Sequence, residues 1–184
     1  MTRTTFVWTA IFISLSLLYS CGNSSNTYDN TERKTNDILQ LEDGTISLNL
    51  EKADCYSDVV NPSGNTAEWS VVVTKAGRYN VWLSSATKDT TNLRYKNNVL
   101  VSVQDNRLEG YPDCDRIVLD SKEVSYPYYR CDSYLGTMYI QDTGKYNVQI
   151  ISEKILPVNY TASGTSDSDI SKVLSLSFTP ENRN

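Results

Sequence analysis

The stretch AEWSVVVTKAGRYNVWL, residues 67 to 83, decides the fold class because every second residue on both sides of a turn is large and apolar. Alternation with period two is typical of strands that place one face in a core. The connection runs from Lys75 to Arg78, and its Gly77 can adopt a positive φ. We therefore predict two strands joined as a hairpin. Their inward residues would be Trp69, Val71, Val73, Tyr79, Val81 and Leu83.

The same alternation recurs along the rest of the chain, and no segment shows the apolar stripe of an amphipathic helix. In the last run, Leu174, Leu176 and Phe178 are expected to share one face. The prolines fall between the runs or, as Pro180, at the end of one, where a missing amide donor costs no ladder hydrogen bond. Many half-buried strands in one modest domain predict an all-β fold, an antiparallel jelly-roll β-sandwich of about 8–10 strands over residues 38–184. The alternating runs span residues 45–51, 67–83, 99–104, 115–119, 138–150 and 170–180.

The first twenty residues predict a bacterial lipoprotein signal peptide. Arg3 supplies a positive start, Phe6 to Leu18 is mainly apolar but too short to span a bilayer, and Ser20 precedes Cys21. Cleavage would leave Cys21 as an acylated first residue, and two or more acyl chains anchor a protein stably to a membrane. An ordinary signal with a coincidental cysteine, or a failed transmembrane segment, are the alternatives.

Residues 21–37 are expected to form the lipidated cysteine and a flexible spacer, because residues 22–36 are rich in Ser, Asn and Thr and contain no aliphatic side chain. The predicted location is therefore the cell envelope, with the sandwich tethered to a membrane by lipid. The sequence leaves open the periplasmic side or the outer surface.

Charge and composition exclude several functions. The chain has 17 basic and 22 acidic residues, a net charge of −5, which disfavours nucleic acid as a partner. It has no histidine, which removes Ser-His-Asp and Cys-His catalysis and every histidine-ligated metal site. Paired carboxylates, or a tyrosine or lysine base, remain possible for catalysis.

Three cysteines remain after lipidation of Cys21, namely Cys55, Cys114 and Cys131. An exported protein meets oxidising conditions, and we predict a disulfide between Cys114 and Cys131, which both lie in Pro- and Tyr-rich surroundings typical of loops. Cys55 follows a strand-like run and could be a buried thiol that behaves as a small hydrophobe. The alternative is that all three stay reduced.

Three segments together resemble one known family. EWSVVVTKAGRYNVWLSSA (68–86), DTGKYNV (142–148) and LSLSFTP (174–180) are similar in order to the strands and turns of carbohydrate-binding modules of families 6 and 35. The resemblance implies a galactose-binding-domain-like sandwich that binds a poly- or oligosaccharide, with a possible structural calcium ion. Glu51 and Asp54, in the segment EKAD, are the nearest match to the calcium-binding carboxylates of that family.

Tyrosine is the strongest compositional signal, with 13 in the chain and five in SYPYYRCDSYLGTMY, residues 125–139. A flat aromatic ring beside polar groups suits a sugar, which has one apolar C–H face and a rim of hydroxyls. Individual tyrosines could instead pack at strand ends, and Trp82, opposite in parity to Val81 and Leu83, could lie under a loop. The candidate carbohydrate-binding residues are Trp82, Tyr126, Tyr128, Tyr129, Arg130, Asp132 and Tyr134.

These observations favour a non-catalytic, lipid-anchored envelope protein that binds carbohydrate. A protein-interaction or structural module of an envelope complex is the first alternative, because tyrosine also suits protein interfaces. A small polysaccharide lyase or hydrolase that works without histidine is the second.

Overall fold

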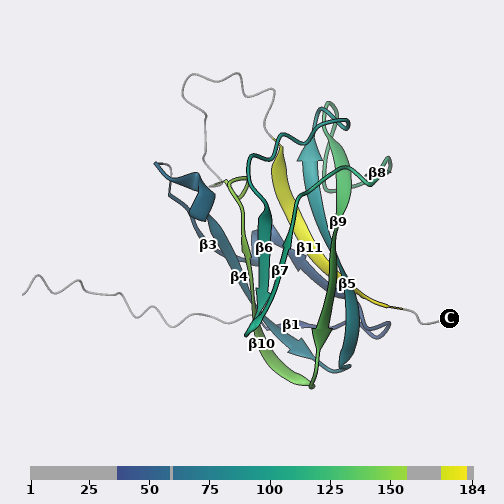
Figure 1. The fold of residues 1–184 in the computed structure, drawn as a ribbon. Helices are drawn as coiled ribbons and strands as arrows, with labels where there is room; N and C mark the ends of the chain where they lie inside the picture. The colour runs from purple at the N-terminus through teal and green to yellow at the C-terminus, as the bar shows by residue number, and fades with distance from the viewer. Residues whose placement is uncertain (1–36, 59, 157–170, 182–184) are drawn as a thin grey trace, which may run out of the picture. The chain divides into compact units, whose positions relative to one another are not determined.

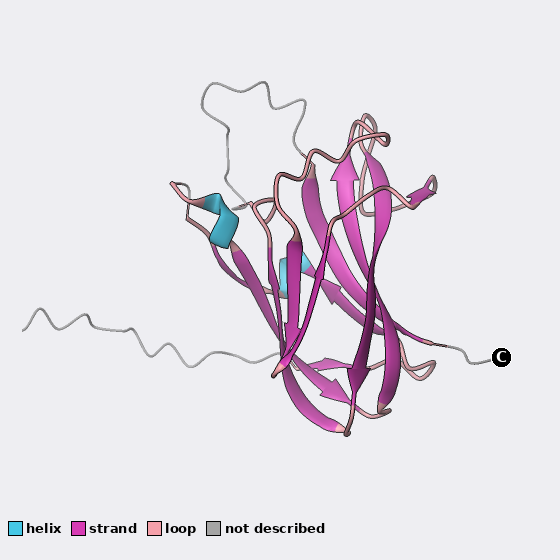
Figure 2. Cartoon of the chain, in the orientation of Figure 1, coloured by secondary structure: helices cyan, strands magenta, loops and turns pink. Residues whose placement is uncertain are grey.

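Two β-sheets face each other in the computed structural model, which describes residues 37–58, 60–156 and 171–181 (Figure 1). Within these residues there is no α-helix, and two short 3-10 turns, Leu50–Lys52 and Pro62–Gly64, are the sole helical elements (Figure 2). The first sheet contains β1 (Ile38–Leu39), β3 (Asp54–Tyr56), β4 (Thr66–Val73), β6 (Val99–Val103), β7 (Asn106–Gly110) and β10 (Gly144–Ile151). The second contains β2 (Ile46–Asn49), β5 (Gly77–Thr87), β8 (Arg116–Val118), β9 (Tyr129–Ile140) and β11 (Lys172–Pro180).

The strand order confirms the predicted antiparallel β-sandwich. The six-stranded sheet runs β1-β4-β10-β6-β7 with β3 also paired to β4, and the five-stranded sheet runs β2-β11-β5-β9-β8. Eleven strands occur in the described residues, slightly more than the predicted 8–10, because several have only two or three residues. Apart from the parallel pair β1–β4, the strand pairs in this part of the chain are antiparallel.

The core lies between the sheets and consists of the residues that alternation predicted. Trp69, Val71 and Val73 of β4 face Tyr79, Val81 and Leu83 of β5, and all six are buried. The indole N–H of buried Trp69 also has a hydrogen-bond partner, because Nε1 donates to the Asn49 carbonyl at 2.9 Å. Burying one such side chain contributes about 1.5–3 kcal/mol, so the inward face of each strand is strongly specified.

The predicted hairpin between residues 67 and 83 is wrong. β4 and β5 belong to different sheets, and the residues between them cross from one layer to the other. The buried Gln40 side chain explains this corner, because its Oε1 accepts from the backbone N–H groups of Thr74 at 2.8 Å and Lys75 at 2.7 Å. The chain's turn donors are thus satisfied by a side chain rather than by a hairpin ladder.

The last strand also departs from the predicted pattern. β11 carries a β-bulge between Val173 and Ser175, so Val173 is buried while Leu174 is only partly so. An extra residue in one strand shifts the alternation on one side of the bulge. Leu176 and Phe178, beyond it, are fully buried as expected.

Candidate functional site

The outer face of the five-stranded sheet carries the most aromatic and charged group of side chains that the strands bring together. Trp82 points to this face because its neighbours Val81 and Leu83 are fully buried in the core. The register places Trp82 opposite Tyr134 of β9 on one side and Ser177 of β11 on the other. We define the Trp82 face as the outward residues of β5, β8 and β9, namely Arg78, Asn80, Trp82, Ser84, Arg116, Val118, Arg130, Asp132, Tyr134, Thr137 and Tyr139.

A bulge in β9 brings Tyr134 to this face. Val81 pairs with Gly136 and Trp82 with Tyr134, so Leu135 is the extra residue. Met138 and Ile140 point into the core, and without the extra residue strict alternation would point Tyr134 into the core as well. Gly136 makes the bulge possible, because its φ is +138° and a Cβ there would lie 2.9 Å from a methyl group of Leu108.

Trp82, Tyr134 and Arg116 form the centre of the face. The rings of Trp82 and Tyr134 have centroids 5.2 Å apart and planes tilted by 52°. The Arg116 guanidinium lies over the indole at 5.3 Å from its centroid, a cation–π arrangement. Tyr134 remains 43% exposed and the Arg116 side chain 62% exposed, whereas Trp82 is partly buried. A ligand on this face would therefore meet a phenol ring, the open part of an indole and a guanidinium together.

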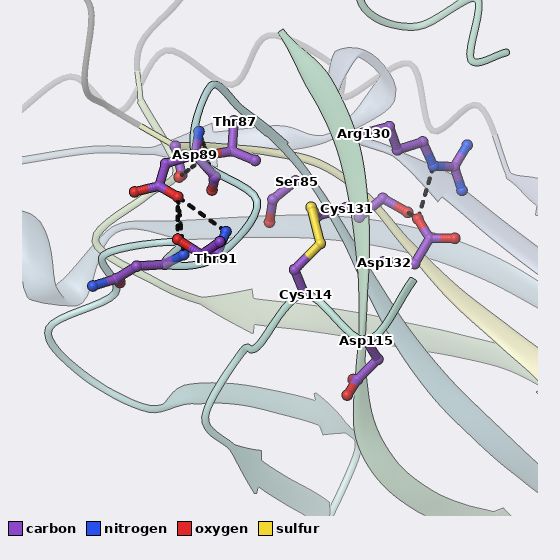
Figure 3. The surroundings of a disulfide bond; sticks show 12 residues. Ser85, Thr87, Asp89, Thr91, Cys114, Asp115, Arg130, Cys131 and Asp132 are labelled. Atoms are coloured by element: carbon purple, nitrogen blue, oxygen red, sulfur yellow. Dashed lines mark hydrogen bonds and ion pairs between the residues drawn. A yellow bond between two sulfur atoms is a disulfide. The ribbon is translucent and has the colours of Figure 1, made fainter. Parts of the chain in front are cut away.

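Asp132 lies beneath this group and is buried. It accepts from Arg116 Nη2 at 2.5 Å, from Arg130 Nε at 2.8 Å (Figure 3) and from Ser84 Oγ at 2.8 Å. Burial alone would raise the pKa of this carboxyl, but the hydrogen bonds from Arg130, Arg116 and Ser84 outweigh it, and the pKa lies below its ordinary value. Asp132 therefore stays charged and holds Arg116 in place, rather than presenting oxygen atoms to a ligand.

Arg130 is largely committed to neighbours as well. Its Nη1 pairs with Glu123 Oε2 at 2.6 Å while its Nε bonds Asp132, and only 25% of its side chain is exposed. On the same face, the Tyr134 backbone N–H donates to Asp115 Oδ2 at 2.7 Å, and its hydroxyl lies 2.9 Å from Thr137 Oγ1. These contacts fix the phenol ring against the sheet.

The other three predicted tyrosines lie away from this centre. Tyr126 is 88% exposed and Tyr128 is partly buried under the Lys88 ammonium, 5.1 Å from the ring centroid, and both precede β9. Tyr129 is the first residue of β9 and alternates with Arg130, so its side chain lies on the other side of that strand. The sequence cluster is thus divided, with Tyr134, Arg130 and Asp132 joined to Trp82 and the remaining tyrosines at the end of the strand.

The predicted disulfide is present. Cys114 and Cys131 are bonded, with their Cα atoms 5.2 Å apart (Figure 3). Cys131 is buried in β9, and Cys114 lies two residues before the start of β8, so the bond fixes the segment that carries Arg116. The prediction that Cys55 is a buried thiol is wrong, because β3 is a short edge strand and leaves Cys55 exposed and reduced.

The far end of the Trp82 face is hollowed. A depression of about 550 Å³ is lined by Gly77, Arg78, Tyr139 and Glu181. Arg78 and Tyr139 are cross-strand partners, and Tyr139 is 54% exposed. Sequence reasoning missed Arg78, Arg116 and Tyr139 as site residues. The sequence did contain a signal for the two arginines. Arg78 precedes Tyr79 and Arg116 precedes Ile117, so strand alternation places each arginine on the face opposite to that neighbour.

The calcium candidates Glu51 and Asp54 are both exposed. In the described part of the chain, no three His, Cys, Asp or Glu side chains gather as a metal site would require. Calcium binding stays a prediction. The predicted lipidation site Cys21 and spacer 21–37 lie outside the described residues, except for Asp37. Among the residues that the structure describes, no helix is long and apolar enough to cross a membrane.

Comparison with known proteins supports the fold. No family model and no curated sequence matches the chain. Among solved structures, an α-L-fucosidase from Vibrio sp. strain EJY3 matches with a TM-score of 0.60 and 17% identity over 78% of this chain. A GH26-CBM35 β-(1,4)-mannanase from Podospora anserina (TM-score 0.45, 10% identity, 77% of this chain and 29% of the enzyme) also matches. The CBM36-1 domain of a multidomain xylanase from the hindgut metagenome of Trinervitermes trinervoides matches as well, with a TM-score of 0.39 and 9% identity over 76% of this chain and 99% of that domain. The chain spans 24% of the fucosidase, so what the two share is one β-sandwich.

Proposed function

We propose that this chain is a non-catalytic carbohydrate-binding module, and that lipid attached to Cys21 anchors it at the cell envelope. The observation that carries the proposal is the pairing of Trp82 with Tyr134 on an open sheet face, 5.2 Å between ring centroids. Tilted aromatic rings with polar neighbours suit the C–H face and hydroxyl rim of a sugar. Because both rings are fixed by strands, little side-chain entropy is lost on binding.

Two further observations support carbohydrate as the ligand. Residues 68–86, which resemble carbohydrate-binding modules of families 6 and 35, contain Trp82 itself. The sandwich is also shared with part of an α-L-fucosidase. A shared fold does not dictate function, so the aromatic face remains the main support.

The chemistry of the face favours binding over catalysis. Its central carboxylate, Asp132, has a lowered pKa and is enclosed by two arginines and a serine, so it is a poor proton donor near neutral pH. The chain has no histidine to replace it.

A glycan array followed by isothermal titration tests the binding. Trp82→Ala and Tyr134→Ala should each weaken binding of the selected glycan about tenfold or more, because each removes one stacking ring. Tyr56→Ala is the matched control, since Tyr56 is 50% exposed on the opposite sheet. Equal affinities for all four proteins would overturn the proposed site.

The anchor is tested separately. Cys21→Ser should move the protein from the membrane fraction to the soluble fraction and abolish labelling with a radioactive fatty acid. Retention of both properties in the variant would contradict lipidation at Cys21.

Protein binding is the second candidate, and one observation favours it. Leu119 is 80% exposed and Tyr126 88% exposed in the segment between β8 and β9. Exposed aromatic and aliphatic side chains are common at protein interfaces. Recovery of one envelope protein by the parent chain but not by Leu119→Ser/Tyr126→Ser, with no glycan bound, would favour this function.

A further inference from the structure

The two outer faces of the sandwich differ in charge. Outward strand positions of the five-stranded sheet carry four basic residues, Arg78, Arg116, Arg130 and Lys172, and one acidic residue, Asp132. Those of the six-stranded sheet carry two basic residues, Arg107 and Lys145, and three acidic residues, Asp54, Glu68 and Glu109. Three acidic residues outside these strands, Asp115, Glu123 and Glu181, also lie at the Trp82 side, so this side is distinguished by its exposed guanidinium groups rather than by a net positive charge.

Two of these arginines have donors that face solvent. Arg116 is 62% exposed and uses Nη2 to reach Asp132, which leaves its other N–H groups directed away from that contact. Arg78 is exposed, and its side chain makes no ion pair with any residue that the structure describes. Arg130, by contrast, is occupied by Asp132 and Glu123.

The aromatic residues lie between the backbone positions of the two arginines along the sheet, and the Arg116 guanidinium reaches back over the Trp82 indole. Arg116 pairs with Asp132, which pairs with Ser84, and Arg78 is six residues from Ser84 along β5. At the rise of an extended strand, these two positions are about 20 Å apart. Trp82 and Tyr134 lie between them, and Tyr139 is beside Arg78 at the hollow. This spacing suits a polymer that crosses several sugar units rather than a single chain end.

We propose that the Trp82 face binds an anionic polysaccharide along the direction of β5, with Arg116 and Arg78 each meeting an acidic group of the polymer. The inference rests on the proposed carbohydrate-binding function and names its ligand class. The planar guanidinium fork matches both carboxylate and sulfate oxygens, while the rings contact the sugar C–H faces. Glu181 lines the hollow beside Arg78 and opposes an anion there.

The test uses the full-length protein in detergent and pairs of polymers that differ only in charge. Polygalacturonate is compared with its methyl ester, and dextran sulfate with dextran. Binding should be roughly tenfold tighter to the charged member of at least one pair, since hydrogen bonds to charged groups are the stronger ones. This preference should shrink as salt is raised.

Charge variants locate the effect. Arg116→Gln and Arg78→Gln should each lower affinity for the preferred acidic polymer roughly tenfold, and Glu181→Gln should raise it. Arg107→Gln, an exposed arginine on the other sheet, is the matched control and should have no effect. The Arg116→Gln protein could fail to fold because its contact with Asp132 is lost. In that case the affinity of Arg78→Gln for the acidic polymer decides whether the arginines bind it.

The outcomes separate this inference from the function on which it rests. Equal binding of charged and neutral polymers, weakened by Trp82→Ala but not by the arginine variants, would overturn the inference and leave carbohydrate binding intact. No binding to any polymer would overturn both. Arginine-dependent binding to anionic lipid vesicles without polysaccharide binding would also overturn both.

Discussion

Trp82 and Tyr134 lie directly opposite each other on β5 and β9, with ring centroids 5.2 Å apart, because β9 contains one extra residue at Leu135. If the rings bind one ligand as a unit, their contributions to affinity are coupled. A double-mutant cycle with Trp82→Ala and Tyr134→Ala should give a coupling energy of about 0.5–3 kcal/mol, measured by titration with the selected glycan. Additive losses would show that the two rings act separately.

The role of Gly136 in the bulge can be tested by substitution. Gly136→Ala would place a Cβ 2.9 Å from Leu108 at a φ of +138°, so we expect a destabilisation of about 1–3 kcal/mol in urea unfolding and weaker glycan binding. Gly64→Ala is the control, since nothing lies within 4 Å of its Cβ position. Comparable stability of the two variants would contradict the role of Gly136.

The disulfide between Cys114 and Cys131 encloses a sequence separation of 17 residues. Loop closure of this length contributes about 3 kcal/mol in the chain-entropy model, so the free energy of unfolding should fall by that order under reducing conditions. Cys55→Ser, at an exposed thiol, should behave as the parent protein in both conditions. A reduced protein as stable as the oxidised one would refute this.

Asp132 predicts a pH dependence of stability. Its folded-state pKa is lowered, so its contribution is present above the ordinary carboxyl value of about 4 and is lost as the pH falls through the lower folded value. Asp132→Asn should cost about 3 kcal/mol at neutral pH and flatten the loss of stability on acidification below about pH 4. The exposed Asp105→Asn should retain the parent profile. The same acid loss in all three proteins would exclude Asp132 as its source.

Local alternation predicted which side chains enter the core, because burial of Trp69, Tyr79 or Val81 depends on strand parity alone. Sheet membership could not be read in this way. The residues between β4 and β5 look like a hairpin turn, but Gln40, more than 30 residues upstream, binds their backbone donors. Pairing partners are decided by such distant contacts.

Only part of the candidate site was predictable, namely the side chains whose outward direction follows from alternation within a single strand. Trp82 faces outward as its neighbours require, and the register joins it to the predicted Tyr134, Arg130 and Asp132. Two features were hidden from the sequence. The bulge at Leu135 reverses the side to which Tyr134 points, and the register of the three-residue β8 places Arg116 beside Asp132.

The covalent bond to β9 also has a consequence for recognition. β8 is a three-residue edge strand, and Cys114, two residues before Arg116, is bonded to Cys131 of the neighbouring strand β9. The disulfide therefore adds a covalent restraint to the Asp132 ion pair that holds the Arg116 guanidinium over Trp82. If the Trp82 face binds carbohydrate as proposed, we expect reduction of this disulfide to weaken that binding as well as to lower stability.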